Sequence, residues 1–430
     1  MGNKLNEDFI INLSKNKNEP IWMKEFRLNA YHKFLELENP SFGPEININF
    51  DDITYYKGSF KSPSCSWNNV NKNVKDTFSS LGVIDAEEKY LKGVSNQYES
   101  EVVYHNMKDE SGIIFLSTDE ALKKYPDLFE KYFNNLVKYD ENKYTALNSA
   151  LWSGGSFIYI PPYTNVDRPL QSYFRIDTKN LGQFERTIII VDHDSSLHYI
   201  EGCTAKNYSS SSLHAGVVEI YVGKNSKCKY STIQNWSKDV YNLVTKRAIV
   251  EENGFMQWVD GNIGSKVTMK YPSCILKGDN SSASSISIAY AKEGQHLDAG
   301  AKMFHLGKNT KSTIISKSLA SGGGHSDYRG TVKIGENATN SFAIIKCDNI
   351  ILDSKSSSNT YPKNIVLNNS STLEHEATIS KINEEKLLYL KSLGISEDAA
   401  KDLYVLGFMS DFKKSLPMEY AVELNRLIKE

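Results

Sequence analysis

Residues 277–310, KGDNSSASSISIAYAKEGQHLDAGAKMFHLGKNT, carry the same short turn at both ends. A glycine, then a lysine or aspartate, then an asparagine occurs at Gly278 and again at Gly307, 29 residues later. Between the turns lie short runs of β-branched and aromatic residues separated by Gly, Asn, Asp and Ser, without a sustained helical period. The stretch therefore predicts strands that recur between equivalent turns.

The same turn occurs at further positions along the chain. VGKNS places it at Gly223 and IGENA at Gly335, so that successive spacings are 55, 29 and 28 residues. Because 55 is about twice 28, a missing copy of the turn is expected near residue 251, where EENGF supplies a turn. A further copy is expected one period before Gly223, where the sequence is DHDSS at 192–196. A turn that recurs at this period indicates stacked coils, which form a β-solenoid. A sandwich or barrel has no reason to keep the period.

Helical patterns precede this β region. Apolar residues recur every four positions between Pro20 and Pro40, which predicts one amphipathic helix. A further helix is expected over TDEALKKYPDLFEKYF, with Thr118 as its N-cap and acidic residues in its first turn. Residues 1–145 are therefore predicted to form an α-rich N-terminal region.

Helical patterns return after the β region. Three short amphipathic helices are expected, beginning near Asn383, Ser396 and Ser415. The β core is thus predicted over 146–380 and a C-terminal helical region over 381–430. Because helices this short need packing to be stable, they must contact the solenoid or a partner.

The composition excludes some classes of function. The 430 residues are 40% apolar and 11% aromatic, which is ample for packed cores, and the net charge is −2. Without a basic block, nucleic acid is not an expected partner. The N-terminus lacks the unbroken apolar core of a signal peptide, and no apolar run is long enough to span a bilayer. We expect a soluble chain that is not secreted and has no membrane partner.

The cysteines suggest neither a disulfide framework nor a self-contained zinc site, because they are odd in number, far apart and never in a CxxC pair. A reducing compartment fits best. Cys203 in YIEGCTA reads on its own as a small buried hydrophobe. Cys347 in IIKCDN has charged neighbours, which is a weak sign of a functional thiol. The five cysteines are Cys65, Cys203, Cys228, Cys274 and Cys347.

Three ionisable residues stand side by side in STLEHEATIS, at Glu374, His375 and Glu376. Ser371 and Glu374 have the spacing of a capping box that would open a helix. The β-branched residues that follow favour a strand instead, on which the two glutamates share one face and His375 takes the other. Both interpretations remain open on the residues alone.

No phosphate-binding loop is recognisable. GKNTKST, from Gly307, resembles one, but the second Gly-Lys pair that such a loop requires is missing. If ATP is used, another subunit is expected to bind it.

Long motifs in order resemble one known family over the chain from about residue 17 to its C-terminus. It is the SufB/SufD family, which assembles iron-sulfur clusters in the SUF system, and YIEGCTA and LEHEATISKI point to its SufB branch. Further motifs that carry the resemblance are NEPIWMKEFRLNAY, QYESEVVYHNMKDE, LNSALWSGGSFIYIPP, WVDGNIGSKVTMKYP, GQHLDAGAKMFHLGKNTKSTIISKS and LPMEYAVELNRLI.

The resemblance implies a right-handed parallel β-helix core flanked by helices, and a scaffold rather than an enzyme. Clusters, of the 4Fe-4S type by expectation, would be assembled on it and passed to apo-proteins. The implied partners are the ATPase SufC, docking on the C-terminal helices, SufD, pairing through the β-helix, and SufS with SufE, which donate persulfide sulfur. The family also suggests a reduced flavin, FADH2, in the complex. The compartment would be a bacterial cytoplasm or a plastid-type organelle, such as an apicoplast, that encodes its own copy.

The resemblance also assigns residues. Cys203 falls on the sulfur acceptor, and Cys347 with Glu374, His375 and Glu376 falls on the cluster-assembly site. Asp177 departs from the family, which commonly has Asn there, and Cys65 alone stands where some members have a Cys-rich N-terminal motif, so we expect no cluster there. The family's proposed sulfur path falls on Arg175, Gln234, Trp236 and Lys246.

The spacing of the residues along the sequence narrows the choice of cluster ligands. Cys347 lies 27 residues before Glu374, close to the coil period, so we expect the thiol beside one or both carboxylates, with His375 orienting a neighbour or facing a partner. A cubane normally takes four thiolates, and four suitably placed cysteines are not found here. The missing ligands are expected from oxygen, nitrogen or a second chain. Glu201, two residues before Cys203, is expected to give its thiolate no local help.

Two other classes of function remain. A carbohydrate lyase or hydrolase is possible in principle, because parallel β-helices often carry such sites and clustered carboxylates serve acid and base roles. Secretion would be expected of most such enzymes. A purely structural adaptor is the third, and it predicts that no cysteine matters.

Overall fold

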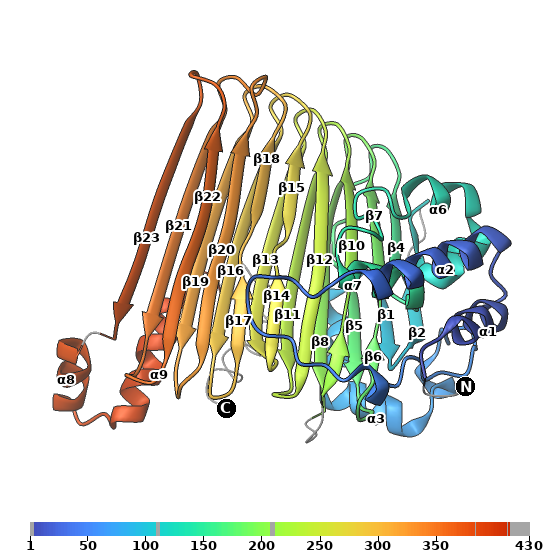
Figure 1. Cartoon of the computed structure of the whole chain (residues 1–430), viewed down its shortest axis with the longest axis horizontal. Helices are drawn as coiled ribbons and strands as arrows, with labels where there is room; N and C mark the ends of the chain where they lie inside the picture. Colours follow the sequence, from blue (N-terminus) through green and yellow to red (C-terminus); the bar gives the residue numbers. More distant parts are fainter. Residues whose placement is uncertain (1–3, 109–111, 207–210, 383, 411, 413–430) are drawn as a thin grey trace.

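The computed structural model describes residues 4–108, 112–206, 211–382, 384–410 and 412. Its centre is a solenoid whose strands stack side by side along the long axis of the molecule (Figure 1). Two sheets form the walls of the solenoid. Their strands pair in parallel, except in two antiparallel pairs near the N-terminal end. The predicted β-solenoid is confirmed.

One wall is a ten-stranded sheet. Its strands, in spatial order, are β2 (Glu101–Met107), β1 (Gly93–Tyr98), β5 (Leu170–Ile176), β8 (Ser196–Ala205), β11 (Lys227–Trp236), β13 (Phe255–Gly264), β16 (Ser282–Ala291), β19 (Lys311–Ala320), β21 (Phe342–Ile351) and β23 (Thr372–Lys381).

The other wall is a thirteen-stranded sheet. Its main order is β14 (Val267–Lys270), β17 (His296–Ala299), β20 (His325–Ile334), β18 (Lys302–His305), β15 (Ser273–Leu276), β12 (Val240–Val250), β10 (Val217–Val222), β7 (Arg186–Val191), β4 (Ser156–Ile160) and β3 (Ile114–Ser117), with β22 (Ser357–Val366), β6 (Gly182–Gln183) and β9 (Ser212–His214) paired alongside.

The repeated turn sets the length of each coil. Its asparagine adopts the left-handed conformation at Asn225, Asn280 and Asn309, and the expected further copies are found at Asp194 and Asn253. Asparagine and aspartate tolerate this conformation better than other residues with a side chain. The five side chains form a hydrogen-bonded ladder with donor–acceptor distances of 2.9 to 3.2 Å.

The IGENA turn departs from the pattern. Its left-handed residue is Asn340, not Asn337, so this coil is longer than the 28-residue period predicts. Position 311 of the ten-stranded sheet pairs with 342, whereas 227 pairs with 255. Coil length therefore varies, and a fixed period cannot align residues across the last coils.

Side chains alternate between the interior of the solenoid and its outer surface. In β8, β11 and β13 the interior positions include Tyr199, Tyr230 and Trp258, which are buried and pair in register across the coils. Their ring centroids are 5.0 and 5.2 Å apart. Because interior residues repeat every second position, the other members of the same strands can be assigned to a face.

Helices flank the solenoid at both ends of the chain. They are α1 (Glu7–Lys17), α2 (Ile21–Glu36), α3 (Lys72–Ser80), α4 (Val83–Tyr90), α5 (Thr118–Lys124), α6 (Pro126–Tyr132), α7 (Lys143–Leu151), α8 (Glu384–Ser392) and α9 (Glu397–Phe408), with short 3-10 turns at Phe50–Asp52 and Trp67–Asn69.

The N-terminal region differs from the prediction in three respects. It is α-rich, but it also contributes β1, β2 and β3 to the two walls. The helix expected from Thr118 is two helices, because Tyr125 leaves the helical conformation before Pro126, which begins α6. The N-cap is Ser117, whose side chain accepts a hydrogen bond from the backbone N–H of Glu120.

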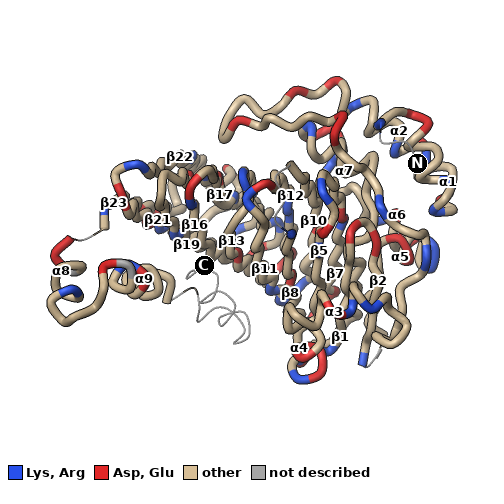
Figure 2. Tube along the Cα trace, turned by 90° about the horizontal axis from the view of Figure 1, so that it is seen from below, with Lys and Arg blue, Asp and Glu red and all other residues tan. Residues whose placement is uncertain are grey.

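The helices cover different faces of the solenoid (Figure 2). α1, α2 and α7 pack with the outer face of the thirteen-stranded sheet, through residues such as Leu243 and Met269. At the opposite end, Val405, Met409 and Phe412 pack on outward residues of the ten-stranded sheet, such as Val259 and Leu319. The third predicted C-terminal helix, from Ser415, lies outside the described residues.

Charges of both signs are interspersed along the solenoid and the helices (Figure 2). Within the part of the chain that is described, no helix has the length and apolar character needed to cross a membrane.

Candidate functional site

Cys203 lies inside the solenoid. It shares the interior face of β8 with Tyr199 and is fully buried. Its Sγ lies 3.7 Å from Oε1 of Glu201, which accepts the thiol hydrogen bond. Burial raises the pKa of the Cys203 thiol well above its ordinary value, and the carboxylate of Glu201 raises it further. In this state Cys203 is a neutral thiol with a proton acceptor beside it.

A buried ionic cluster surrounds this pair. Lys246 Nζ lies 3.2 Å from Glu201 Oε1 and 2.9 Å from Thr232 Oγ1. Lys270 Nζ lies 2.8 Å from Asp260 Oδ1. Burial opposes ionisation of Glu201, but the charge of Lys246 and a hydrogen bond from a tyrosine outweigh it and hold the pKa of the carboxyl below its usual value. Buried charges of this kind persist only when they are paired.

Three of the four predicted path residues lie inside with Cys203. Gln234 pairs with Cys203 in register, and its Oε1 accepts hydrogen bonds from Asn242 and Lys270. Trp236 packs in the same small cluster as Cys203. Lys246 contacts Glu201 directly, as described above.

Arg175 lies apart from these residues. It alternates with the interior positions of β5 and points outward, where its guanidinium lies 2.6 Å from a carboxylate oxygen of Asp177 and its Nη1 donates to Thr204. The aspartate that departs from the family pattern therefore neutralises the arginine.

Cys347 lies near the other end of the solenoid. It is buried on the interior face of β21, and its Sγ is 3.9 Å from Nε2 of His375 in β23. Burial raises the pKa of the Cys347 thiol to about 12, partly offset by the neighbouring hydroxyl of Tyr328. On the far side of the imidazole, the side-chain amide of Asn364 lies 3.0 Å from Nδ1. This contact fixes the orientation of the imidazole.

This geometry corrects the expected stacking of Cys347 with the carboxylates. The last coil is 30 residues long, so Cys347 pairs with Ala377, and Lys346 pairs with Glu376. Ala377 faces the interior as Cys347 does. Glu374 and Glu376 lie an odd number of positions from Ala377, so they face the other side of the strand, which is the outer face. His375, two positions before Ala377, takes the interior face with the thiol. The strand interpretation of 374–376 is confirmed, and the capping box is wrong.

One interior row connects the two cysteine regions. Its members pair in register from one coil to the next, are all buried and, unlike the aromatic row beside them, all carry polar or thiol side chains. Ser287 donates a hydrogen bond of 3.2 Å to Ser316 within it. We call it the polar row, and it consists of Glu201, Thr232, Asp260, Ser287, Ser316 and Cys347.

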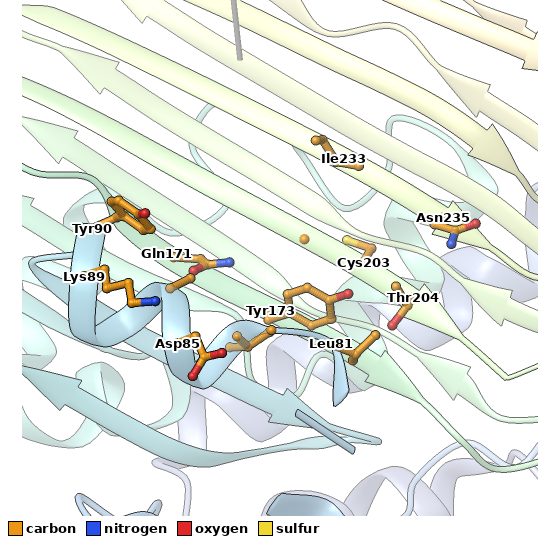
Figure 3. A pocket seen from close by; sticks show the side chains of 14 residues that line it. Leu81, Asp85, Lys89, Tyr90, Gln171, Tyr173, Cys203, Thr204, Ile233 and Asn235 are labelled. Carbon is orange, nitrogen blue, oxygen red and sulfur yellow. The ribbon is translucent and has the colours of Figure 1, made fainter. Parts of the chain in front are cut away.

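A cavity of about 210 Å³ lies outside the wall at Cys203. It separates α4 from the ten-stranded sheet, and the ring of Tyr173 stands between the helix and the cysteine (Figure 3). The same ring lies against Gly202, where any side chain would collide with it. The cavity therefore reaches the backbone of Cys203 from outside while its sulfur faces inward.

Comparison with known proteins identifies the family. Residues 174–408 match the SUF system FeS cluster assembly SufBD core domain, and residues 11–172 match the SufBD protein N-terminal region. The chain belongs to the SufBD family.

Two members of the SufBD family show how close the similarity is. The iron-sulfur cluster assembly protein SufB of Bacillus subtilis (strain 168) is 53% identical over 429 residues, which cover 99% of this chain and 92% of that protein. An iron-sulfur cluster assembly SufBD family protein of Staphylococcus aureus (strain MRSA252) is 54% identical over the same shares of both chains. The resemblance to the SufB branch is confirmed.

Several site residues of this SufBD family member could not be found by motif. Asp260, Lys270 and Tyr230 lie in runs that read as ordinary strands, and only the structure brings them together. The sequence does hold one indication of this cluster, because charged residues stand at interior positions of the strands, where charge is rare. These positions can be recognised only when the interior face of each strand is already known.

Proposed function

We propose that the chain is the scaffold on which iron-sulfur clusters are assembled and from which they pass to apo-proteins. The observation that supports this most directly is the polar row, because it joins the surroundings of one buried cysteine to a second cysteine that faces a histidine. A solenoid that served only as an adaptor would have no need for buried charges there, which are costly unless paired.

Cys203 is the proposed acceptor of persulfide sulfur. Its thiolate attacks the terminal sulfur of the donor persulfide, forming a new S–S bond as the donor leaves as a thiolate. Glu201 Oε1, 3.7 Å from the sulfur, is placed to take the thiol proton. The cavity between α4 and the wall is the side from which a donor such as SufE, working with SufS, would approach, and docking would have to open the wall there because the Cys203 sulfur faces inward.

Cys347 and His375 are the proposed first ligands of iron in the growing cluster. Thiolate and imidazole both suit iron, and the 3.9 Å between their ligating atoms is close to the separation that one ion would bridge. Glu374 and Glu376 are exposed on the outer face of the last strand, from which they can reach a second chain. SufD, pairing with this end of the solenoid, would supply the remaining ligands.

The ATPase SufC is proposed to dock on α8. Leu388 and Tyr389 in α8 and Leu393 directly after it are 60 to 68% exposed, which is an unusual concentration of apolar surface on one short segment. ATP would then be bound by that partner alone. A 4Fe-4S product and a reduced flavin serving the complex complete the proposal.

The scaffold is favoured over the carbohydrate-active alternative. Glu201 and Asp260 are buried and bound to lysines inside the coil, where a saccharide chain has no access.

The proposed compartment is a bacterial cytoplasm or a plastid-type organelle, and the relatives named above are bacterial.

Anaerobic reconstitution with iron and sulfide tests the proposal. The wild-type chain, with its partners, should develop the visible absorption of an iron-sulfur cluster. Cys347→Ala should lose it, and Cys65→Ala, which removes an exposed thiol, should keep it. A wild-type complex without the chromophore, or a Cys347→Ala complex with full cluster yield, would contradict the scaffold.

A further inference from the structure

Two histidines and an aspartate meet on the outer face of the thirteen-stranded sheet, on the side of the wall opposite to the polar row. His296 lies in β17, and His325 and Asp327 lie in β20. The register places the two histidines side by side, with ring centroids 4.2 Å apart. Nε2 of His296 is 3.0 Å from Oδ2 of Asp327, and Nε2 of His325 is 2.8 Å from Oδ1.

We propose that these three side chains bind one divalent transition-metal ion. One ligating atom from each lies within 4.8 Å of the other two. A tetrahedral ion with bonds of about 2.0–2.1 Å holds its ligand atoms roughly 3.3 Å apart, so small side-chain movements would open the site to an ion. Two imidazoles with one carboxylate are a ligand set that suits Zn²⁺ and Fe²⁺.

The strands give the site a rigid support. Both elements are paired within the sheet, so the spacing of the three residues is fixed by the backbone rather than by a loop. Asp327 is 4% exposed, while the side chains of His296 and His325 are 30% and 26% exposed. The carboxylate therefore forms the floor of the site, and an ion can enter between the imidazoles.

The neighbouring strand β22 supplies contacts that orient the ligands. Nδ1 of His325 is hydrogen-bonded to Ser357 Oγ, which leaves Nε2 directed at Asp327. The backbone N–H of Asn359 donates to Asp327 Oδ1 at 3.2 Å. Outer contacts of this kind are a regular feature of metal sites.

Asn359 also offers a fourth ligand. Its Nδ2 lies 3.2 Å from His325 Nε2 and 3.0 Å from Asp327 Oδ1. Rotation of the amide by half a turn exchanges nitrogen and oxygen and would direct a carbonyl oxygen at the ion. A histidine–aspartate–histidine hydrogen-bond chain would explain the contacts without metal, and the two accounts differ in what they predict for ion binding.

The surrounding charge suits a cation. Asp298, one coil away in register with Asp327, is bound by Arg329 at 2.9 Å, so these two charges offset each other. The carboxylate of Asp327 then remains as the negative charge that faces the two imidazoles. This inference does not depend on the proposed function, because none of its residues belongs to the polar row.

Calorimetric titration of the chelator-treated full-length chain with Zn²⁺ tests the site. We expect His325→Gln and Asp327→Asn to remove one ion per chain, or to weaken its binding at least about 100-fold, and Ser357→Ala to weaken it roughly 10-fold. X-ray absorption of the wild-type chain with one equivalent should show imidazole and oxygen ligands. His193→Gln is the matched control, because His193 pairs with Asp194 without a second histidine in the described structure, and it should bind as wild type does.

The titration is repeated anaerobically with Fe²⁺, for which the same order of variants is expected. Should Asp327→Asn fail to fold, His296→Gln, with its more exposed side chain, replaces it. The proposal is overturned if the variants bind Zn²⁺ with unchanged stoichiometry and affinity, or if the first equivalent is coordinated by sulfur, which would place it at the cysteines instead.

Discussion

At the scale of single residues, the central feature is a thiol that is held neutral next to a base. Inside the solenoid, burial disfavours the thiolate of Cys203, and Glu201 disfavours it further, although the same carboxylate can accept the proton. The expectation that Glu201 does not favour the Cys203 thiolate is correct, because the negative charge of the carboxylate raises the pKa of the thiol. It overlooks that the carboxylate lies close enough to accept the thiol proton. Reactivity should therefore depend on a docked donor that opens the site.

We predict that Cys203 of the free chain resists alkylation. Cys65 is exposed to the reagent, whereas Cys203 is buried inside the solenoid. Because the pKa of Cys203 is raised, raising the pH to 9 should not accelerate its labelling. Iodoacetamide labelling followed by mass spectrometry should find Cys65 modified at least about 100-fold faster. Comparable rates at neutral pH would refute the buried, neutral thiol.

A second prediction concerns the ligands beside Cys347. His375 faces the thiol and the glutamates face outward, so His375→Ala should reduce iron retention in the isolated chain by about 10-fold or more, as Cys347→Ala does. Glu376→Ala should have little effect there, but should abolish clusters in the complex with SufD. Iron content after gel filtration measures both, with every variant made in a His325→Gln background so that iron at the outer histidine site does not contribute. A larger loss for Glu376→Ala than for His375→Ala in the isolated chain would contradict this assignment.

At the scale of elements, sequence patterns predict what depends on local chemistry. The turn asparagines were sufficient to predict the solenoid and to place its missing copies, because the left-handed conformation restricts which residues can stand there. They could not predict which residues stack, because coil length varies and one extra residue reverses every face. Because the length of the last coil was unknown, the sequence did not predict the contact of Cys347 with His375. The interior cluster around Lys246 was not predicted either, because its residues come from strands that are distant in the sequence.

The C-terminal helices were predicted from the sequence, but which of their residues pack on the solenoid was not. The proposed docking of the ATPase on them can be tested. Residues Val405, Met409 and Phe412 pack on the solenoid, so removing everything after residue 396 would uncover the wall as well as any docking surface. Leu388→Glu in α8, combined with Leu393→Glu directly after the helix, is the sharper change. We expect it to weaken binding of the ATPase by roughly 10-fold or more without lowering the melting temperature.

Leu35→Glu is the matched control, because Leu35 is equally exposed on a helix at the other end of the molecule. Its binding should equal that of wild type. Full-strength binding of the α8 variant, measured by calorimetry, would move the docking surface elsewhere.

At the scale of the whole molecule, the solenoid separates two chemistries and connects them. The proposed sulfur acceptor lies near the N-terminal helices, the proposed cluster ligands lie near the last coil, and the polar row runs between them inside the solenoid. The stacked coils make this possible, because each contributes one side chain to each row at a fixed position. We propose that sulfur reaches Cys347 from Cys203 along this row.

Persulfide mapping tests that claim most directly. The complex is incubated with the sulfur-donating pair, and mass spectrometry then measures added sulfur on the Cys203 and Cys347 peptides. Ser316→Val removes a hydroxyl from the polar row next to Cys347, and Ile314→Val changes the preceding interior position of the same strand as a control. We predict that Ser316→Val leaves Cys203 loaded and lowers loading of Cys347 at least about 10-fold, with Ile314→Val unchanged. Equal loading of Cys347 in the Ser316→Val and wild-type complexes, or loading of Cys347 in a Cys203→Ser complex, would contradict the account.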